Sequence, residues 1–464
     1  MKESVMFFSR SSHKVPMTEG PLLKNTFIFS LPLMFSGWLQ LLFNAADTIV
    51  VGRFSGQQAL AAVGSTGSLN QLLICLFLGL GTGANVIVAR AIGAKDHARA
   101  SAGAHTAVTT ALLSGLILAV LGNVLSRPLL QLMDSPADVI DLSTTYMRII
   151  FLGMPMQLLY NFCAALLRSV GDTKRPLYFL SVAGVANVLL NLLFVIVLKM
   201  SVAGVALATI ISHTISALLA LRSLTHRDDM LKIELKKLRI DPSIFLEIAR
   251  IGLPTGVQSA MFSIANVLIQ STRNSFGSTV MAGCAAAANV GGFISQGLNA
   301  FAMACTSFVS QNYGAKKPQR ILRAMWVCQL WSFLISGTLG VLGFIFGKQL
   351  LSLYNTDPEV IYWGFQQFCL ANVPIALMGF QSIFSGALRG IGYSLLPMCI
   401  SLVGICLFRV VWVMTVFKSN PTLICLNISY PVSWVLTGAV MGITFFYFFK
   451  RVRTKLLADT SAAI

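Results

Sequence analysis

Charged residues are scarce in this sequence. Asp, Glu, Lys and Arg together make up 11% of the 464 residues, and 16 residues are acidic. Soluble domains average about 25% charged residues. Hydrophobic residues make up 56% of the chain, and the mean hydropathy is +0.77. The apolar runs are continuous rather than alternating, which excludes a transmembrane β-barrel. The composition therefore predicts an all-α polytopic membrane protein.

Motifs for several other functions are also missing. No G-x-x-x-x-G-K-[ST] motif occurs, so the chain is not expected to hydrolyse ATP. The nine cysteines show no C-x-x-C spacing and lie in apolar segments, where they are interpreted as small buried hydrophobic side chains. We find no clustered His, Asp or Cys residues of the kind that a membrane-embedded enzyme would need. No enzymatic activity is expected, and no cofactor apart from a coupling ion.

Basic residues give the chain a net charge of +18, and they cluster in short loops between apolar segments. With the N-terminus inside, the inner segments hold 26 Lys and Arg residues and the outer loops hold 6. This bias predicts that both termini are cytoplasmic, and it explains the positive charge without nucleic acid. The 12 predicted transmembrane helices are 25–52, 58–90, 102–125, 139–167, 176–198, 201–221, 245–272, 279–312, 321–347, 358–388, 395–417 and 422–449.

An internal repeat relates the two halves of the chain. Leu31-Pro32 recurs as Leu253-Pro254, and Gly93-Ala94-Lys95 recurs as Gly314-Ala315-Lys316. The two intervals along the chain are nearly equal. Each half then has six helices, and an even number leaves both halves facing the same way. We therefore predict two pseudo-symmetric six-helix lobes, a parallel repeat with its axis along the membrane normal.

The repeat sets the expected domain boundaries. They are an N-lobe at 1–221 with a cytoplasmic tail, a cytoplasmic linker at 222–244, a C-lobe at 245–449 and a C-terminal cytoplasmic tail at 450–464. The linker is basic and contains LKIELKKLRI. It could lie on the membrane surface, but a solvated linker is favoured because no clear helical moment is present.

Asp47 is the acidic residue that lies well inside an apolar span; the other fifteen lie in tails, in loops or near segment ends. A charged side chain at the bilayer centre costs roughly 2.5–3.5 kcal/mol on insertion scales, so such a residue indicates a functional site. We predict that Asp47 binds the coupling cation. The alternative is a structural ion pair with Arg148.

Three polar side chains are predicted to lie at a depth similar to that of Asp47. At a rise of about 1.5 Å per residue, Asp47 lies roughly 7 Å, Asn191 about 10 Å and Thr209 about 12 Å from the outer ends of their spans. Asn187 shares a helix face with Asn191. Together these oxygen ligands suit a proton on the carboxylate or a bound Na⁺. For the two amides and the hydroxyl, interhelical hydrogen bonding is the alternative.

Other polar residues within the spans are candidates for substrate contact. Helix packing is the alternative for each amide. An arginine within a span could bind an anionic group or extend toward the outer interface, and we favour the second for both Arg148 and Arg409. The candidates are Asn44, Gln258, Asn266, Gln270, Asn289, Gln296, Asn299 and Arg148.

Gly79, Gly81 and Gly83 form G-x-G-x-G inside the second span. No strand precedes them, so close helix packing is preferred over nucleotide binding.

Four stretches of the chain carry a family resemblance. They are LPLMFSGWLQLLFNAADTIVVGRFSGQQALAAVG in spans 1 and 2, NVIVARAIGAKDHARA after span 2, LLRSVGDTKRPLY after span 4 and LRGIGYSLLP after span 10. With them, nearly the whole chain resembles the multidrug and toxic compound extrusion (MATE) family of the MOP flippase superfamily. The pattern is most similar to the bacterial branch with MepA-like and DinF-like exporters.

The resemblance implies two six-helix lobes around an outward-opening central cleft. The family's N-lobe cation site maps onto Asp47, Asn187, Asn191 and Thr209. Some members have an acid at the position of Asn191 and another in span 7, where this chain has Phe262. The resemblance therefore leaves all acidic coupling chemistry to Asp47.

The expected function is export of amphipathic, often cationic organic compounds in exchange for Na⁺ or H⁺ by alternating access. We expect a monomer in the bacterial cytoplasmic (inner) membrane, with small organic substrates and membrane lipids as partners and no nucleic acid. The alternative is a flippase for lipid-linked oligosaccharides or another lipid, from the same superfamily. Flipping a pyrophosphate-linked lipid would favour a strongly cationic cleft, and only Arg148 and Arg409 lie within the spans.

Overall fold

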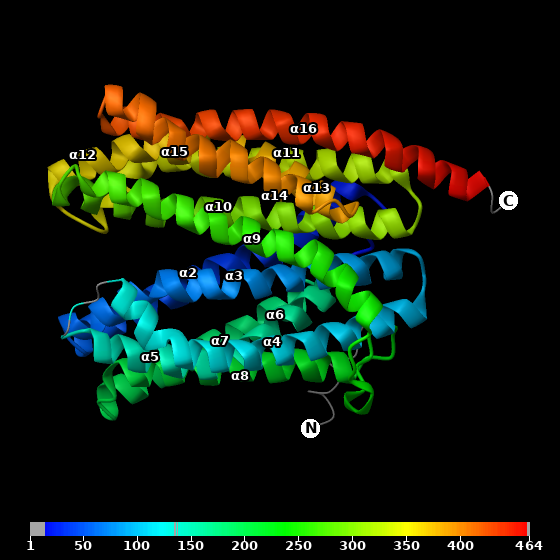
Figure 1. Cartoon of the computed structure of the whole chain (residues 1–464), viewed down its shortest axis with the longest axis horizontal. Helices are drawn as coiled ribbons and strands as arrows, with labels where there is room; N and C mark the ends of the chain where they lie inside the picture. Colours follow the sequence, from blue (N-terminus) through cyan, green and yellow to red (C-terminus); the bar gives the residue numbers. More distant parts are fainter. Residues whose placement is uncertain (1–13, 134–135, 137, 462–464) are drawn as a thin grey trace. The chain divides into compact units, whose positions relative to one another are not determined.

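The computed structural model describes residues 14–133, 136 and 138–461, and this part of the chain is built of helices and short connections (Figure 1). Eight long helices each form one candidate span. They are α2 (Leu22–Phe54), α3 (Gln57–Gly93), α4 (His97–Leu132), α8 (Ser201–Thr225), α9 (Pro242–Asn274), α10 (Ser278–Gly314), α11 (Pro318–Ser352) and α16 (Leu423–Ser461).

Four further spans are each composed of several helical segments. The first two are α5 (Ile140–Leu152) with α6 (Met154–Ser169), and α7 (Lys174–Asn191) with the π-helical η2 (Leu192–Val197). The third joins α12 (Pro358–Gln367), η4 (Phe368–Asn372), η5 (Val373–Leu377) and α13 (Met378–Gly390), and the fourth joins α14 (Leu395–Ser401), η6 (Leu402–Leu407), α15 (Phe408–Trp412) and η7 (Val413–Phe417). Counting the bent α5–α6 pair as one, 12 spans in the described chain are long and apolar enough to cross a membrane. The predicted fold class is confirmed.

Prolines account for two of these interruptions. Pro155 lies at the start of α6, where the α5–α6 pair bends by 47°. Pro374 lies in η5, a 3₁₀ segment between α12 and α13. A proline has no N–H to donate, and its ring displaces the preceding turn, so a helix breaks or bends there. Both prolines fall in the fourth helix of their half of the chain.

The described chain packs into two compact units whose limits differ from the two halves of the repeat. Unit 1 contains residues 14–15 and 38–256, and unit 2 contains residues 16–37 and 257–461. The first parts of α2 and α9 therefore pack with the unit formed mostly by the opposite half of the sequence. The boundaries predicted from the repeat describe the duplication, whereas these units describe the packing.

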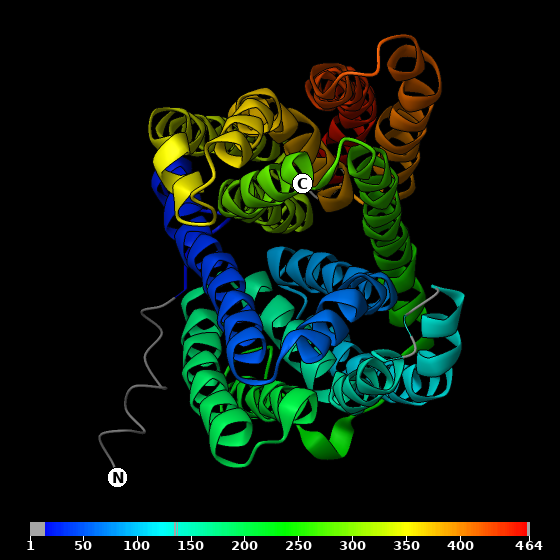
Figure 2. The same ribbon diagram turned by 90° about the vertical axis from the view of Figure 1, so that its left-hand side faces the viewer.

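Within each unit the helices pack against neighbours close in sequence. In unit 1, α4 packs against α5 and α6, and α7 packs along α8. In unit 2, α10 packs against α11 and α13, and α16 packs against α13. In Figure 2 many helices of each unit are seen from near their ends, whereas α2, in dark blue, and α9, in green, run across the view. The core of unit 1 is formed by large buried side chains such as Phe151, Met154 and Phe162.

Two of the three glycines of the G-x-G-x-G motif lie at a close helix contact in unit 1. A Cβ atom added at Gly79 would lie 2.4 Å from the carbonyl oxygen of Gly252 and 2.4 Å from the nitrogen of Gly256. One added at Gly83 would lie 2.3 Å from the carbonyl oxygen of Ile248. The partner atoms are backbone atoms and cannot rotate away. These contacts support the interpretation of the motif as helix packing.

The segment between α8 and α9 is folded onto unit 1. Leu231 and Ile233 are buried in its core. The backbone N–H of Glu234 donates to Nε2 of His105 at 3.1 Å, and that of Asp241 donates to Oγ1 of Thr106 at 3.1 Å. The prediction of a solvated linker is wrong here, because the apolar side chains of Leu231 and Ile233 are buried while Lys232 between them remains exposed.

Asp229 of this segment anchors an ionic cluster at the predicted cytoplasmic end of unit 1. It accepts hydrogen bonds from Lys14 Nζ at 2.6 Å and from Arg227 Nη2 at 2.8 Å. Arg227 is buried and also lies 3.9 Å from Asp172. Partial burial alone would raise the pKa of Asp229, but the hydrogen bonds and charges of Arg227 and Lys14 outweigh it and lower the pKa below its ordinary value.

We predict that Gly79→Ala and Gly83→Ala each lower the stability of the purified protein, by about 1–3 kcal/mol, because α3 and α9 must separate. Gly81→Ala is the matched control, since its Cβ would meet Phe162 at an ordinary 3.6 Å. Thermal unfolding in detergent measures the effect. Equal unfolding temperatures for all three variants would contradict the proposed packing role.

A second prediction concerns acid stability. Because the pKa of Asp229 is lowered in the folded protein, its contribution is present above the ordinary value of about 3.9 and is lost as the pH falls below it. Asp229→Asn should therefore be less stable than wild type at neutral pH and should lose less stability between about pH 5 and pH 3. Unfolding temperatures across that range test this, with the exposed Glu359→Gln as control. Parallel curves for Asp229→Asn and wild type would refute it.

Candidate functional site

Asp47 lies on the second half of α2, within unit 1, and its side chain is partly buried. Its Oδ1 accepts a hydrogen bond of 2.5 Å from Nδ2 of Asn191 on α7. The same Nδ2 also donates to Oδ1 of Asn187 at 3.2 Å. Three of the four residues predicted to form the coupling site are therefore joined in one hydrogen-bonded chain.

The two amides are positioned by the local structure of α7. Asn187 and Asn191 are four residues apart, so they lie on one face of the helix, and both are buried, at 4% and 1% exposure. The π-helical segment η2 begins directly after Asn191. Such wide turns within α-helices are frequent at functional sites because they rotate side chains relative to the preceding turns.

The side-chain oxygen of Asn191 is available as a hydrogen-bond acceptor. Its Oδ1 is buried and has no hydrogen-bond partner in the part of the chain that the structure describes. A buried amide oxygen without a partner is uncommon, because leaving it unpaired costs about 1–3 kcal/mol. An oxygen next to a carboxylate is suited to bind a proton donor or a hard cation. The donor set therefore fits Na⁺ or a protonated carboxylate.

Thr209, the fourth predicted site residue, lies on α8 and makes no hydrogen bond to Asp47, Asn187 or Asn191 in the part of the chain that the structure describes, whereas Tyr146 lies on α5. The hydroxyl of Thr209 donates to the carbonyl oxygen of Val205 in its own helix at 2.9 Å, which leaves its lone pairs as acceptors. Tyr146 lies within electrostatic range of Asp47. Sequence reasoning missed Tyr146, because a single tyrosine in an apolar span carries no signal before the helices are assembled.

An apolar cluster surrounds the polar group. It includes Val50 and Val51 from α2, Val195 from η2 and Val205 from α8, against which Tyr146 packs. Such surroundings strengthen electrostatic interactions relative to water. Among the described residues Asp47 forms no salt bridge, and Arg148 is exposed. The alternative of a structural Asp47–Arg148 pair therefore has no support.

The amides proposed to contact substrate fall into two groups. Gln258 is buried in unit 2 and donates to Oγ of Ser401 at 2.8 Å, and Gln381 donates to the same oxygen at 3.2 Å, so Gln258 joins helices. Gln296 is partly buried. Exposed side chains are those of Asn44 on α2, Asn266 and Gln270 on α9, and Asn289 and Asn299 on α10. In a membrane span, an exposed amide is better suited to an aqueous path than to lipid.

Arg409 differs from its prediction. Extension toward the outer interface was favoured, but its side chain is 5% exposed. Its Nε donates to Oγ of Ser433 at 3.3 Å, and its guanidinium lies 4.1 Å from the ring centre of Tyr430. The aromatic face and the hydroxyl stabilise the charge inside unit 2, which hydropathy alone could not indicate.

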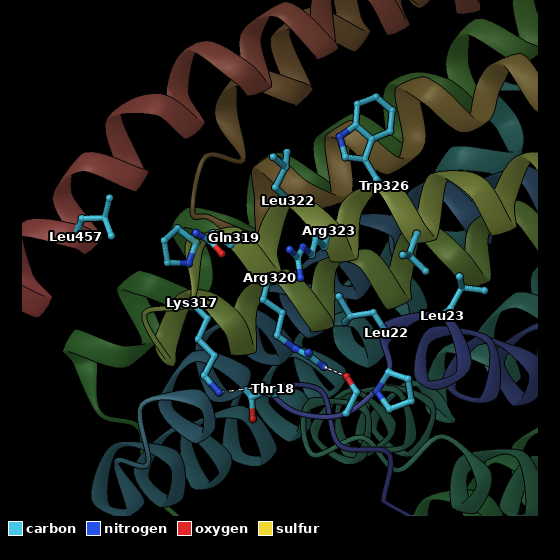
Figure 3. Close-up of a pocket in the computed structure, with 14 residues that line it drawn as sticks. Thr18, Leu22, Leu23, Lys317, Gln319, Arg320, Leu322, Arg323, Trp326 and Leu457 are labelled. Carbon is cyan, nitrogen blue, oxygen red and sulfur yellow. Dashed lines mark hydrogen bonds between the residues drawn. The ribbon is translucent and has the colours of Figure 1, made fainter.

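A cavity of about 900 Å³ lies in unit 2, and none of the predicted site residues lines it (Figure 3). It is lined by Leu22 and Leu23 at the start of α2 and by residues of the first turns of α11. Lys317 donates to the carbonyl oxygen of Thr18 at 3.0 Å, and Arg320 donates to that of Gly20 at 2.9 Å. These basic side chains bind the segment before α2 to unit 2.

In the described residues no group of three or more His, Cys, Asp or Glu side chains could hold a metal ion. The cysteines described are free, and most are buried, as predicted, whereas Cys399 is exposed.

Comparison with known proteins agrees with this architecture. A family model described as MatE matches residues 32–193 and 254–415, one segment in each half of the repeat. The probable multidrug resistance protein YoeA of Bacillus subtilis is 31% identical over 385 residues, which cover 82% of this chain and 83% of YoeA. The chain belongs to the MATE family of membrane transporters. The resemblance drawn from its sequence motifs is therefore confirmed.

More distant relatives extend the comparison. The multidrug export protein MepA of Staphylococcus saprophyticus is 19% identical and is matched over 84% of each chain. The structure of a MOP superfamily transporter from Pyrococcus furiosus superposes with a TM-score of 0.88 at 22% identity, covering 96% of this MATE protein and 100% of that chain. This likeness supports the fold.

We predict that Asn191→Ala weakens coupling-ion binding, because it removes the amide oxygen that would face a cation bound at Asp47. Loss of the donor that stabilises the ion-free carboxylate offsets part of this effect, so the cation concentration for half-maximal transport should rise several-fold. Asn123→Ala is the control, since its amide donates to the backbone of its own helix and of Arg148. Cation-driven efflux from proteoliposomes measures both, and an unchanged half-maximal concentration for Asn191→Ala would argue against this site.

Proposed function

We propose that this MATE protein exports amphipathic, often cationic organic compounds in exchange for Na⁺ or H⁺, and that Asp47 binds the coupling ion. The observation that carries the proposal is the partly buried hydrogen bond from Asn191 to Asp47, beside an amide oxygen that has no partner among the described residues. The family relatives named for multidrug resistance support the substrate class.

The chemistry follows from what an amide can offer. With Asp47 ionised, the N–H group of Asn191 faces it and donates. When a proton or Na⁺ binds to the carboxylate, a donor facing the site is unfavourable and an amide oxygen is favourable. A half-turn of the Asn191 side-chain amide would point Oδ1 toward the bound cation. It would also move Nδ2 away from Oδ1 of Asn187, to which it now donates. Ion binding therefore rearranges the hydrogen bonds between α2 and α7.

Such a rearrangement provides coupling only if the two ion-binding states favour different conformations. α2 meets this requirement in part, because its two ends pack with different units. A change in the contact between Asp47 and α7 acts on the second half of α2 and leaves the contacts of its first half in unit 2 unaltered. We propose that this helix transmits the ionic state of Asp47, in an alternating-access cycle.

The second candidate is a flippase for lipid-linked oligosaccharides or related lipids. The observation in its favour is that unit 2 contains buried guanidinium groups, which could bind a diphosphate. Their exposure of only 5–6% favours the drug exporter over the flippase.

We further propose that the protein is a monomer in the bacterial inner membrane with both termini in the cytoplasm. The bias of Lys and Arg toward one set of loops supports this orientation.

Transport by reconstituted protein tests the main proposal. Proteoliposomes loaded with a fluorescent cationic dye should release it when an inward Na⁺ or H⁺ gradient is imposed, each gradient applied separately. Asp47→Asn should reduce gradient-driven efflux by at least tenfold, because the amide cannot bind the cation as a carboxylate does. Asp141→Asn, which removes an exposed acid near Arg127, is the control.

Undiminished gradient-driven efflux by Asp47→Asn would overturn the coupling role. Absence of dye transport under either gradient, together with movement of a pyrophosphate-linked lipid, would favour the flippase instead.

A further inference from the structure

Two buried arginines of unit 2 lie close together without an acidic partner. Arg273 at the end of α9 is 6% exposed and Arg409 on α15 is 5% exposed. Their guanidinium groups share the ring of Tyr430 on α16, at 5.5 and 4.1 Å from its centre. Neither forms a salt bridge within the described residues. An aromatic ring and hydroxyl groups offset only part of the cost of burying two cations, so an anion is expected nearby.

Some of the donor groups in this cluster have acceptors, and two among the described residues have none. Nη2 of Arg273 donates to Oδ1 of Asn427 at 3.1 Å and to the hydroxyl of Tyr430 at 3.3 Å. Nε of Arg273 and Nδ2 of Asn427 are buried and have no partner among the residues described. An unpaired charged donor costs more than a neutral one. The unpaired groups are donors, which is the pattern expected of a site for an anion.

In the internal repeat, this cluster occupies positions in the second half of the chain that are equivalent to those near Asp47 in the first half. The interval that separates Gly93 from Gly314 also relates buried Val205 on α8 to buried Leu426 on α16. The same interval relates Thr209 to Tyr430. The sixth helices of the two halves are therefore aligned at this depth.

The fifth helix of each half gives a similar match. Buried Leu180 on α7 and buried Ser401 on α14 are separated by that same interval. A π-helical turn holds one more residue than an α-helical turn, and η6 is such a turn. Asn187 therefore aligns with Arg409, one position beyond the interval between Gly93 and Gly314. Both residues are buried.

In the first helix of each half, Leu31-Pro32 matches Leu253-Pro254. The same interval relates Asp47 to Ile269. Arg273 lies one helical turn further along α9. The same three helices that carry the acidic site in one half thus carry two cations in the other.

We infer that Arg273, Arg409, Tyr430 and Asn427 form a binding site for a small inorganic anion, with chloride as the probe. Low exposure of both guanidinium groups restricts the ligand to one of about this size. The anion neutralises the two cations and accepts from Arg273 Nε and Asn427 Nδ2. The duplicated fold therefore has two ion sites of opposite sign.

Bromide, which replaces chloride and scatters anomalously, tests this directly. Crystals of the whole protein grown in bromide should show an anomalous peak within about 3.5 Å of guanidinium nitrogen atoms of Arg273 and Arg409. In solution, replacing gluconate by chloride at constant Na⁺ and ionic strength should raise the unfolding temperature saturably. Arg273→Gln and Arg409→Gln should lose this rise. Lys348→Gln, which removes an exposed cation beside Phe365, should retain it.

Absence of a bromide peak at the cluster in wild type would overturn the site, whatever the unfolding temperatures show. A chloride response that persists in both arginine variants would overturn it as well. Should a variant fail to fold, the bromide experiment on wild type still decides. Because these readouts involve no transport, a failed drug-efflux experiment would leave the anion site standing, and the reverse also holds.

Discussion

The hydrogen bond between Asp47 and Asn191 is the interaction on which the proposed function depends. A carboxylate in an apolar cluster is stable only if its surroundings offset the loss of water. Here one amide N–H provides that compensation and also connects α2 with α7. Any cation that binds Asp47 competes with this donor. In the proposed mechanism, binding of an ion at Asp47 therefore changes the contact between α2 and α7.

The two ends of α2 pack in different units, and this packing relates the proposed ion binding to helix movement. The first half of the helix packs in unit 2, where Phe29 contacts Phe308, and the second half packs in unit 1. Close packing holds each half firmly, as the glycine contacts of α3 with α9 illustrate for the other exchanged helix. Helices that belong to two packed bodies are well placed to relay a local change, because neither end can move without its neighbours.

The duplication has diverged in charge while preserving its geometry. Positions that hold Asn187 and Thr209 in one half hold Arg409 and Tyr430 in the other. Buried charge in a membrane protein is tolerated only with local compensation, so the halves cannot exchange their chemistry one residue at a time. The amides suit a carboxylate and its cation, whereas the aromatic ring suits a guanidinium.

Much of the fold was predictable because hydropathy, Lys and Arg distribution and the repeat all act over whole helices. Most predicted spans agree with the helices to within a few residues, but α4 extends to Leu132, beyond the predicted end at 125, and α16 continues to Ser461 through most of the segment predicted as a C-terminal tail at 450–464. The grouping of Asp47 with Asn187 and Asn191 was predictable from helical depth and the four-residue spacing. The burial of Arg409 and of Leu231 was not, because each depends on partners distant in sequence, Tyr430 for the first and the core of unit 1 for the second. The exchange of α2 and α9 between units is likewise a property of packing that no local pattern encodes.

Direct measurement of cation binding tests the central claim most closely. Equilibrium binding of radioactive Na⁺ to the purified protein, combined with measurement of protons released on binding, counts the coupling ions without a transported substrate. The account predicts one saturable cation, Na⁺ or proton, that is lost in Asp47→Asn. Saturable binding of that same cation with unchanged stoichiometry in Asp47→Asn would contradict it.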